Sequence, residues 1–249
     1  MTVHVLPRYE ELSKKAVEDL SDLLSSVDKP LVCVASGDSP FGLYNELVRK
    51  VKNKEVDISS WSFVGLDEWM GMNGNDEGSC RFHLDRQFFD ALQIEKQKIC
   101  FFDGRTNDPD KECAQTESFI QQHGGIDVAI LGLGMNGHVG MNEPGTVADI
   151  RSHVAEIAPL TQQVGQKYFS ETKSLSHAMT LGIQTLKEAK HIMLLVSGAA
   201  KAPIVKKIFE EKVSEHIPAT FLRDHPGFTI YLDKAAAQFI LHEKRNPGN

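Results

Sequence analysis

The sequence from residue 31 to residue 44 is LVCVASGDSPFGLY. Its first part, Leu31–Ala35, is a short apolar run typical of a buried β-strand, and helical spacing of apolar residues begins at Phe41. Between them, the small residues Ser36-Gly-Asp-Ser39 and then Pro40 mark a turn that leads into a helix N-terminus. A buried strand followed directly by a helix is the repeating unit of a parallel sheet. This stretch therefore favours an α/β fold.

The same pattern recurs along the chain. The apolar runs that predict strands are Leu31–Ala35, Trp61–Leu66, Ile99–Phe102, Ile126–Leu133, His191–Val196 and Phe228–Leu232. Helical spacing is found over Tyr9–Leu24, Phe41–Val51, Phe82–Leu92, Lys111–Gln122, Ala199–Glu211 and Lys234–Leu241. Apolar strands alternating with helices indicate strands buried on both faces. We predict a Rossmann-like, doubly wound, mostly parallel α/β sheet with helices on both faces, in a single domain over residues 1–249, with a mobile flap at residues 146–176.

Composition and charge exclude several classes of protein. Of the 249 residues, 41% are hydrophobic and 24% are charged, which is typical of a folded globular chain. The formal net charge is −7, so we expect no nucleic-acid partner and no anionic membrane surface. No apolar run reaches the roughly 18 residues of a membrane helix, and no secretory signal is evident. The four cysteines form no C-x-x-C pair, which favours a reducing, cytoplasmic location.

The turn after the first predicted strand has two interpretations. Free backbone N–H groups at the start of a helix, the hydroxyls of Ser36 and Ser39 and a close approach at Gly37 would form a cradle for a phosphate group. Alternatively, the turn is an ordinary loop in which Ser39 caps the helix and Pro40 is its first residue. Asp38 opposes an anion unless its side chain points away.

Two acids, Asp67 and Glu68, follow the predicted strand Trp61–Leu66. Ligands of doubly wound sheets bind at the carboxyl ends of the strands, so this position exposes the carboxylates to a substrate. A carboxylate in a cleft acts as a general base, particularly where burial raises its pKa. The alternative is that Asp67 only caps the following turn.

Residues 131–145, with the sequence LGLGMNGHVGMNEPG, follow the next strand and contain a G-x-G-x-x-G pattern. A dinucleotide site is disfavoured because Pro144 leaves too little room for the helix that would hold a pyrophosphate, and because the motif lies in the middle of the chain. A glycine-lined turn that presents His138 and Glu143 is the better interpretation. The imidazole has an ordinary pKa of about 6.5, suited to proton transfer, and Glu143 would hold its tautomer. No H-E-x-x-H motif is present, so we expect chemistry without a metal.

Cations that could meet an anion lie late in the chain. Lys201 is in the first turn of a predicted helix, where it opposes the helix dipole, as a phosphate-binding lysine would. The alternative is a solvated lysine. Arg151, His153 and Lys167 lie in the predicted flap and add positive charge.

Four blocks of the sequence resemble the glucosamine-6-phosphate deaminase family, which includes the galactosamine-6-phosphate isomerases. They are residues 36–44 (SGDSPFGLY), 63–69 (FVGLDEW), 131–145 and 197–201 (SGAAK). Trp69, with Gly78-Ser-Cys80 beyond it, favours the galactosamine branch. The resemblance extends over nearly the whole chain.

The resemblance implies conversion of a 2-amino-2-deoxyhexose 6-phosphate to a ketohexose 6-phosphate and ammonia, with neither metal nor cofactor. It implies that His138, with Glu143 and Asn136, opens the pyranose ring, and that Asp67 moves a proton between C2 and C1. The phosphate would bind the Ser36-Gly37-Asp38-Ser39 turn, Lys201 and Lys167. The expected partner is this small molecule; a homo-oligomer remains open.

The chain departs from the family pattern at several positions. Asn136 stands where many members have aspartate, and Lys167 where we align a phosphate-binding arginine, which loses the bidentate geometry of arginine. Asp38-Ser39 replaces a more usual Gly-Thr. His153 aligns with an allosteric arginine of regulated members, so control by an N-acetylated sugar phosphate is not expected.

Two alternatives remain at this point. A 6-phosphogluconolactonase shares the superfamily but should show a different run where Asn142-Glu143-Pro144 stands. A sugar-phosphate-responsive regulator would keep the phosphate loop without a catalytic set; the retention of Asp67, His138 and Glu143 and the lack of a DNA-binding segment argue against it.

Overall fold

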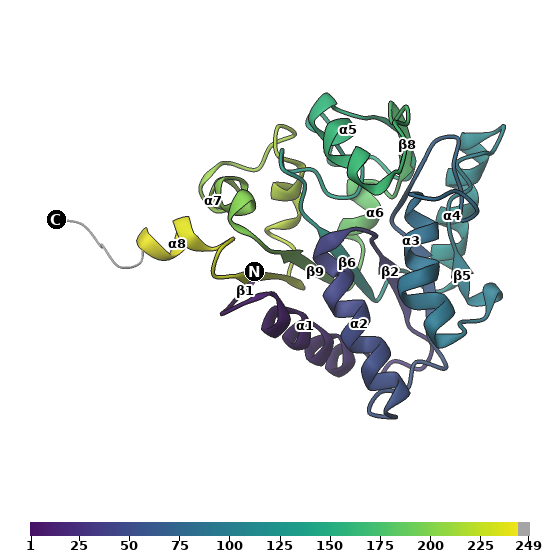
Figure 1. The fold of residues 1–249 in the computed structure, drawn as a ribbon, viewed down its shortest axis with the longest axis horizontal. Coiled ribbons are helices and arrows are strands. Elements are labelled where there is room, and N and C mark those ends of the chain that lie inside the picture. Colours follow the sequence, from purple (N-terminus) through teal and green to yellow (C-terminus); the bar gives the residue numbers. More distant parts are fainter. Residues whose placement is uncertain (244–249) are drawn as a thin grey trace.

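The structure is a computed structural model that describes residues 1–243, so residues 244–249 of the predicted domain lie outside the described residues. Within residues 1–243, the chain forms a seven-stranded sheet and a three-stranded sheet (Figure 1). No helix in this range is both long enough and apolar enough to cross a membrane. The four cysteines are free thiols.

The large sheet has the strand order β1-β10-β9-β6-β2-β3-β5, and all of its strand pairs are parallel. Its strands are β1 (Thr2–Leu6), β2 (Leu31–Val34), β3 (Ser62–Gly65), β5 (Ile99–Cys100), β6 (Val128–Gly132), β9 (His191–Val196) and β10 (Phe228–Asp233). The small sheet is antiparallel, with β8 between the two others. It consists of β4 (Asp67–Trp69), β7 (His153–Glu156) and β8 (His177–Thr180). The prediction of a doubly wound, mostly parallel sheet is confirmed.

Helices cover both faces of the large sheet because side chains alternate along its strands. In β2, Val32 and Val34 pack with residues of α1 and α2, whereas Leu31 and Cys33 pack on the other face with residues of α4, α6 and α7. The helices are α1 (Tyr9–Leu24), α2 (Asp38–Lys52), α3 (Cys80–Leu84), α4 (Pro109–Gln122), α5 (Pro159–Gly165), α6 (Ile183–Lys187), α7 (Ala202–Glu210) and α8 (Gln238–Glu243). The strands are therefore buried on both sides, as their near-continuous apolar runs predict.

Several predicted helices have different bounds in the structure. The predicted helix Phe82–Leu92 is α3 followed by a π-helical turn, Asp85–Phe89, and a 3-10 turn. The predicted helix Ala199–Glu211 begins with a 3-10 turn before α7, and α8 begins at Gln238 rather than at Lys234. Residues 146–176 contain β7, α5 and a 3-10 turn, Gln166–Tyr168. The mobility of this segment stays a prediction.

The direction of chain progression reverses between β2 and β6. From β2 the chain proceeds to β3 and β5 on one side, and it then returns to β6 on the other side. The loops that follow the two strands therefore leave in opposite directions and open a crevice between them, which is where ligands bind in doubly wound sheets. The turn at residues 36–39 and the turn at residues 133–138 follow these two strands.

Candidate active site

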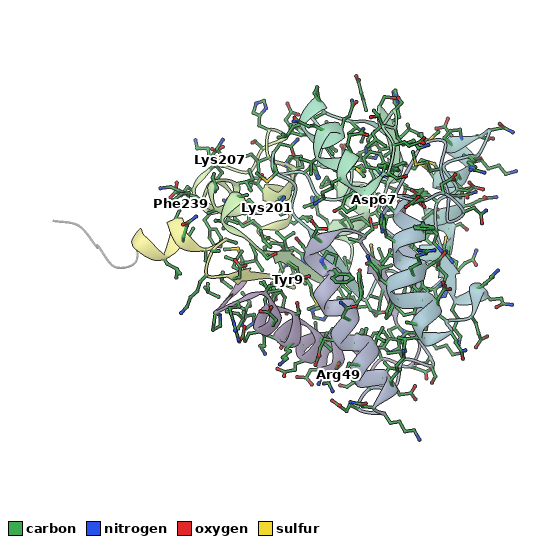
Figure 2. All side chains as sticks on the ribbon, viewed as in Figure 1. Tyr9, Arg49, Asp67, Lys201, Lys207 and Phe239 are labelled. Atoms are coloured by element: carbon green, nitrogen blue, oxygen red, sulfur yellow. The ribbon has the colours of Figure 1, made fainter. Side chains whose placement is uncertain are left out.

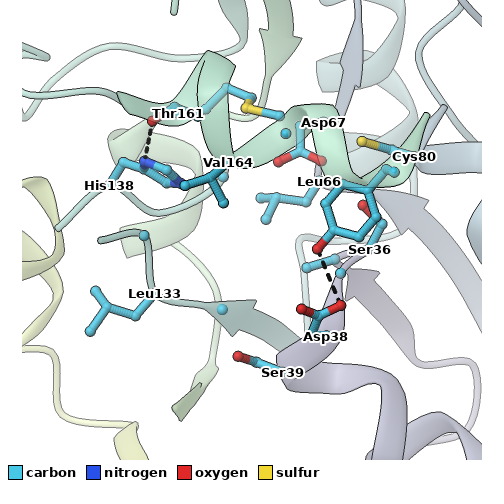
Figure 3. Close-up of a pocket in the computed structure, with 18 of the residues that line it drawn as sticks. Ser36, Asp38, Ser39, Leu66, Asp67, Cys80, Leu133, His138, Thr161 and Val164 are labelled. Carbon is cyan, nitrogen blue, oxygen red and sulfur yellow. Dashed lines mark hydrogen bonds between the residues drawn. The ribbon is translucent and has the colours of Figure 1, made fainter. Parts of the chain in front are cut away.

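A pocket of about 300 Å³ opens at this reversal point, a volume at the lower end of the range of small-molecule sites. It is lined by the turn after β2, by Asp67, by the turn after β6, by α5 and by the start of the helix after β9 (Figure 3). Of the residues predicted for the site, those that line the pocket are Ser36, Gly37, Asp38, Ser39, Asp67, His138, Lys167 and Lys201. Asn136 and Glu143 do not line the pocket. Asn136 accepts a hydrogen bond from the backbone N–H of His138, and Glu143 lies beside the Nδ1 atom of the His138 ring.

Asp67 is the first residue of β4 and is only 7% exposed. Burial raises the pKa of its carboxyl group to about 6, although the Cys80 thiol, which donates a hydrogen bond to it, and the charge of His138 both act in the opposite direction. A strand position does not fit the alternative that Asp67 caps a turn. Asp67 is therefore a buried carboxylate, facing a pocket, whose proton affinity suits a base near neutral pH.

Glu68, which the sequence does not single out as distinct from Asp67, lies on the other side of β4 and is fully buried. Its carboxylate accepts hydrogen bonds from the backbone N–H groups of Trp69, Cys80 and Arg81 at 2.9–3.0 Å. Burial nevertheless raises its pKa to about 7. Glu68 therefore ties the start of α3 to β4 and holds the Cys80 thiol beside Asp67.

His138 lies in the turn after β6, where Gly134 makes room for it: a Cβ atom at Gly134 would be 2.4 Å from the imidazole ring. The Nδ1 atom of His138 is 3.1 Å from Oγ1 of Thr161 and 3.5 Å from Oε1 of Glu143. The ring edge opposite Nδ1 faces the pocket in Figure 3. The closer polar contact of Nδ1 is therefore a threonine that the sequence does not reveal.

Asn136 contacts both Glu143 and the backbone of His138. Its Nδ2 donates to Oε2 of Glu143 at 2.6 Å, and its Oδ1 accepts from the backbone N–H of His138 at 3.2 Å. Burial acts to raise the pKa of Glu143, but hydrogen bonds and charge from His138, Thr161 and Asn136 outweigh it and lower the pKa. Glu143 is therefore a carboxylate at neutral pH, and the predicted grouping of His138, Glu143 and Asn136 is present.

The turn after β2 differs from the alternative in which Ser39 caps α2. The helix begins at Asp38, and its N-cap is Gly37, whose φ of +103° favours glycine. The interpretation of Pro40 as the first helical residue is therefore wrong. Tyr9 fixes this turn from α1: its hydroxyl donates to the carbonyl of Asp38 at 2.6 Å and accepts from the backbone N–H of Gly42 at 2.6 Å.

Two lysines face the pocket from opposite elements. Lys201, from the 3-10 turn before α7, donates from Nζ to the carbonyl of Leu133 at 2.5 Å. Burial, together with the charge of Lys167, lowers the pKa of Lys201 to about 8. Lys167, from the turn after α5, forms an ion pair with Asp38. Two cations and the N-terminus of α2 thus lie beside the buried acid–base groups.

Comparison with known proteins agrees with this geometry. Residues 8–231 match the family described as glucosamine-6-phosphate isomerases/6-phosphogluconolactonase. The chain belongs to this family. It is 35% identical to a glucosamine-6-phosphate deaminase of Geobacillus sp. (strain WCH70) over 238 residues, 95% of either chain. It is 37% identical to one of Shouchella clausii (strain KSM-K16), over 94% of this chain and 95% of the relative.

Solved structures of the family have the same fold. A structure described as a monomeric glucosamine-6-phosphate deaminase superposes with a TM-score of 0.92 at 33% identity, covering 96% of this chain and 99% of that one. A 6-phosphogluconolactonase from Trypanosoma brucei superposes with a TM-score of 0.75 at 20% identity, over 96% and 98% of the two chains, which shows the fold alone. The predicted family and the prediction of an enzyme are confirmed.

The family fold also accounts for the G-x-G-x-x-G pattern. Residues 133–145 form turns and a bridge between Val139 and Asn142, with no helix that could hold a pyrophosphate. Within residues 1–243, no group of three or more His, Cys, Asp or Glu side chains is placed to hold a metal ion. His153 lies outside the pocket lining, with its Nδ1 2.9 Å from the carbonyl of Arg151.

Proposed function

We propose that the chain converts a 2-amino-2-deoxyhexose 6-phosphate to a ketohexose 6-phosphate and ammonia, with glucosamine-6-phosphate or its C4 epimer galactosamine-6-phosphate as substrate and without a metal ion. The observation that carries this proposal is a buried carboxylate, Asp67, with a pKa of about 6, in the same pocket as His138 and two lysines. The relatives named glucosamine-6-phosphate deaminase support it.

Ring opening is the first step that the geometry supports. His138 takes the proton of the anomeric hydroxyl and returns a proton to the ring oxygen, which breaks the bond between C1 and that oxygen and produces an aldehyde. Glu143 and Asn136 stabilise the charged imidazole, since the carboxylate stays ionised beside it. A histidine is suited to both proton transfers because its ordinary pKa is about 6.5.

Asp67 performs the isomerisation. Its carboxylate removes the proton from C2 of the open-chain aldehyde while O1 takes up a proton from solvent, which gives an enolamine. The carboxylate then delivers the C2 proton to C1, which leaves a protonated imine at C2. Water adds to C2 and the nitrogen departs as ammonia with the extra proton, that is, as ammonium, so the product is a ketose with the phosphate unchanged. A carboxylate whose pKa is raised by burial is a stronger base than an exposed one and is still ionised at neutral pH.

The phosphate is assigned to the other side of the pocket. The N-terminus of α2, the hydroxyls of Ser36 and Ser39, and the ammonium of Lys201 provide donors and positive charge there. Trp69, Gly78 and Cys80, which belong to the residues that favour the galactosamine branch, also line the pocket, and this supports a contact between them and the sugar.

The decisive experiment is an assay of ammonia and ketohexose phosphate released from glucosamine-6-phosphate and from galactosamine-6-phosphate, with and without a chelator. We expect release from at least one epimer at a rate that the chelator does not change. Hydrolysis of 6-phosphogluconolactone without ammonia release from either amino sugar would replace the proposal by a lactonase. Tight binding of either sugar phosphate without turnover would indicate a regulator.

A further inference from the structure

An acidic side chain stands at the mouth of the pocket, on the side assigned to the phosphate. Asp38 is the first residue of α2, and its side chain is 72% exposed. Its carboxylate forms an ion pair with Nζ of Lys167 and accepts a hydrogen bond from the hydroxyl of Tyr168 at 3.4 Å (Figure 3). The carboxylate of Asp38 is therefore paired with Lys167, one of the two lysines that are expected to bind the phosphate.

The ordinary role of an acid in the first turn of a helix does not account for this contact. Such acids cap free backbone N–H groups or interact with the helix dipole. Gly37, the N-cap of α2, has no side chain to cap the helix, and the hydroxyl of Tyr9 accepts from Gly42, further along the helix. The carboxylate of Asp38 contacts the turn Gln166–Tyr168 instead. The backbone N–H groups of Asp38 and Ser39 thus remain available to a ligand while the side chain of Asp38 is engaged elsewhere.

The charges of the pocket explain why an acid is tolerated there. Lys167 and Lys201 both line the pocket, and the charge of Lys167 acts with burial to lower the pKa of Lys201. Asp38 acts in the opposite direction on Lys201. Burial acts to lower the pKa of Lys167, but the hydrogen bond and charge of Asp38, together with Tyr168, outweigh it and raise the pKa. When no anion is bound, Asp38 therefore favours the protonated form of both lysines.

The ion pair is also easy to displace. The side chain of Lys167 is 46% exposed and that of Asp38 is 72% exposed, and ion pairs with this much exposure contribute little to stability. A phosphate monoester carries close to two negative charges at neutral pH and has three acceptor oxygens, so it outcompetes a single carboxylate for a lysine. The aspartate can move into solvent without breaking any buried contact.

We propose that Asp38 is a displaceable internal counter-ion, which holds Lys167 until the substrate's phosphate replaces its carboxylate. Asp38 thereby sets the affinity of the pocket for anions, because every phosphate that binds must first break the pair with Lys167. The same carboxylate returns to Lys167 when the product leaves. This inference rests on the assignment of the phosphate to this side of the pocket.

The test is the binding of inorganic phosphate to the full chain, followed by ³¹P NMR titration, which measures millimolar affinities. We expect Asp38→Asn to lower the dissociation constant by about three- to tenfold, because it removes both the competing carboxylate and its repulsion of the phosphate. Asp38→Ser should act in the same direction. Glu188→Gln is the matched control: it removes one negative charge from an exposed ion pair, with Arg151, among residues that do not line the pocket. An unchanged or higher dissociation constant in both Asp38 variants would overturn the proposal.

A double-mutant cycle separates competition for Lys167 from simple repulsion. In Lys167→Gln, the added change Asp38→Asn should give much less gain in phosphate affinity than it gives in the unaltered chain. An equal gain in the two backgrounds would show that Asp38 repels the phosphate directly, and the counter-ion role would be lost. Thermal unfolding of each variant verifies that the chain is folded.

The ammonia assay keeps this inference distinct from the proposed reaction. Ammonia release by the unaltered chain, together with an unchanged phosphate affinity in Asp38→Asn, would refute the counter-ion and leave the reaction standing. A gain in phosphate affinity that depends on Lys167, without ammonia release from either amino sugar, would support the counter-ion and refute the reaction.

Discussion

The two sides of the pocket are built in different ways. On the side of the base, Asp67 and Glu68 continue directly from the central sheet and are 7% and 0% exposed. On the side of the anion, the side chains of Asp38 and Lys167 are 72% and 46% exposed and belong to elements that meet only at the surface. The first side is held by burial and by hydrogen bonds to the backbone, whereas the second is held by an exposed ion pair.

This difference in burial determines two properties of the site: the proton affinity of Asp67, and the ease with which Asp38 and Lys167 exchange partners. Burial decides how tightly Asp67 holds a proton, because the carboxylate cannot be solvated. Exposure leaves Asp38 and Lys167 free to exchange partners, because breaking their pair costs little. Changes on the buried side should therefore alter the chemical step and the stability, while changes on the exposed side should alter affinity.

The largest expected effect is on the chemical step. Asp67→Asn removes the base but keeps the volume and an acceptor for the Cys80 thiol, so we expect kcat for ammonia release to fall at least about a hundredfold. The measurement is steady-state ammonia release, with circular dichroism as the check on folding. The matched control is Asp127→Asn, since Asp127 is also buried but directly precedes β6, at the opposite end of the strands from the pocket. A kcat that stays within a few-fold of the unaltered chain would remove Asp67 from the mechanism.

The next largest effect is on the free energy of unfolding, which is lowered when the buried carboxyl group of Asp67 is ionised. In the folded chain the pKa of Asp67 is about 6, and in an unfolded chain an aspartate has a pKa of about 3.9. Between about pH 4 and pH 6, Asp67 is therefore still protonated in the folded chain but already ionised in the unfolded chain. The stability that this proton contributes is present at low pH and is lost as the pH rises through about 6.

Asp67→Asn removes this pH dependence. We expect the variant to gain about 2 kcal/mol of unfolding free energy relative to the unaltered chain between pH 4.5 and pH 7.5, measured by denaturant unfolding at both values. Glu68 titrates in the same direction, and the charge of Asp67 raises its pKa, so the difference reports Asp67 together with its effect on Glu68. A difference that is the same at the two pH values would mean that the carboxylate is solvated rather than buried.

Strands and site residues were predictable from the sequence where burial is continuous. The run His191–Val196 has the same bounds as β9, because almost every residue of that strand is buried. β7 escaped prediction because only Ala155 among its residues is buried. Asp67, His138 and Lys201 were predictable because each follows a buried strand, where this fold places its ligands.

Other parts of the site depend on contacts that no local pattern shows. Thr161 is 23 residues from His138 in the sequence, and the pair of Asp38 with Lys167 joins residues 129 apart. These contacts arise only when α5 and the turn after it are packed over the crevice. The sequence pattern identified residues 146–176 as a separate segment, and the family resemblance singled out Lys167 within it, but no signal indicated that Thr161 also faces the pocket.

On the anion side, the effect of Lys201 should be on KM. Lys201→Met removes the half-buried ammonium, and we expect KM for the amino-sugar phosphate to rise roughly tenfold with little change in kcat. In the unaltered chain, kcat/KM should fall as the pH rises through about 8, where Lys201 loses its proton, and this limb should be missing in the variant. Lys207→Met is the control, because Lys207 lies on the adjoining helix but points to the periphery (Figure 2). A KM that does not change would place the phosphate elsewhere.

The smallest effect tests whether α5 takes part in ring opening. Thr161→Val keeps the shape of the side chain but removes the hydroxyl that lies 3.1 Å from Nδ1 of His138, so the ring keeps Glu143, at 3.5 Å, as its nearest polar neighbour. We expect kcat to fall roughly fivefold with KM nearly constant, since the lost contact is worth about 1 kcal/mol. The acidic limb of the pH profile should also move to higher pH, because the hydrogen bond from Thr161 helps to lower the pKa of Glu143.

A matched variant separates this role from packing. Thr161→Ser retains the hydroxyl and loses a methyl group, so it should restore both kcat and the pH profile if the hydroxyl positions His138. If Ser and Val variants are equally impaired, the methyl group and its packing in α5 account for the loss. In that case α5 belongs with the exposed side of the pocket as a cover for the ligand, and His138 is held by Glu143 and Asn136 alone.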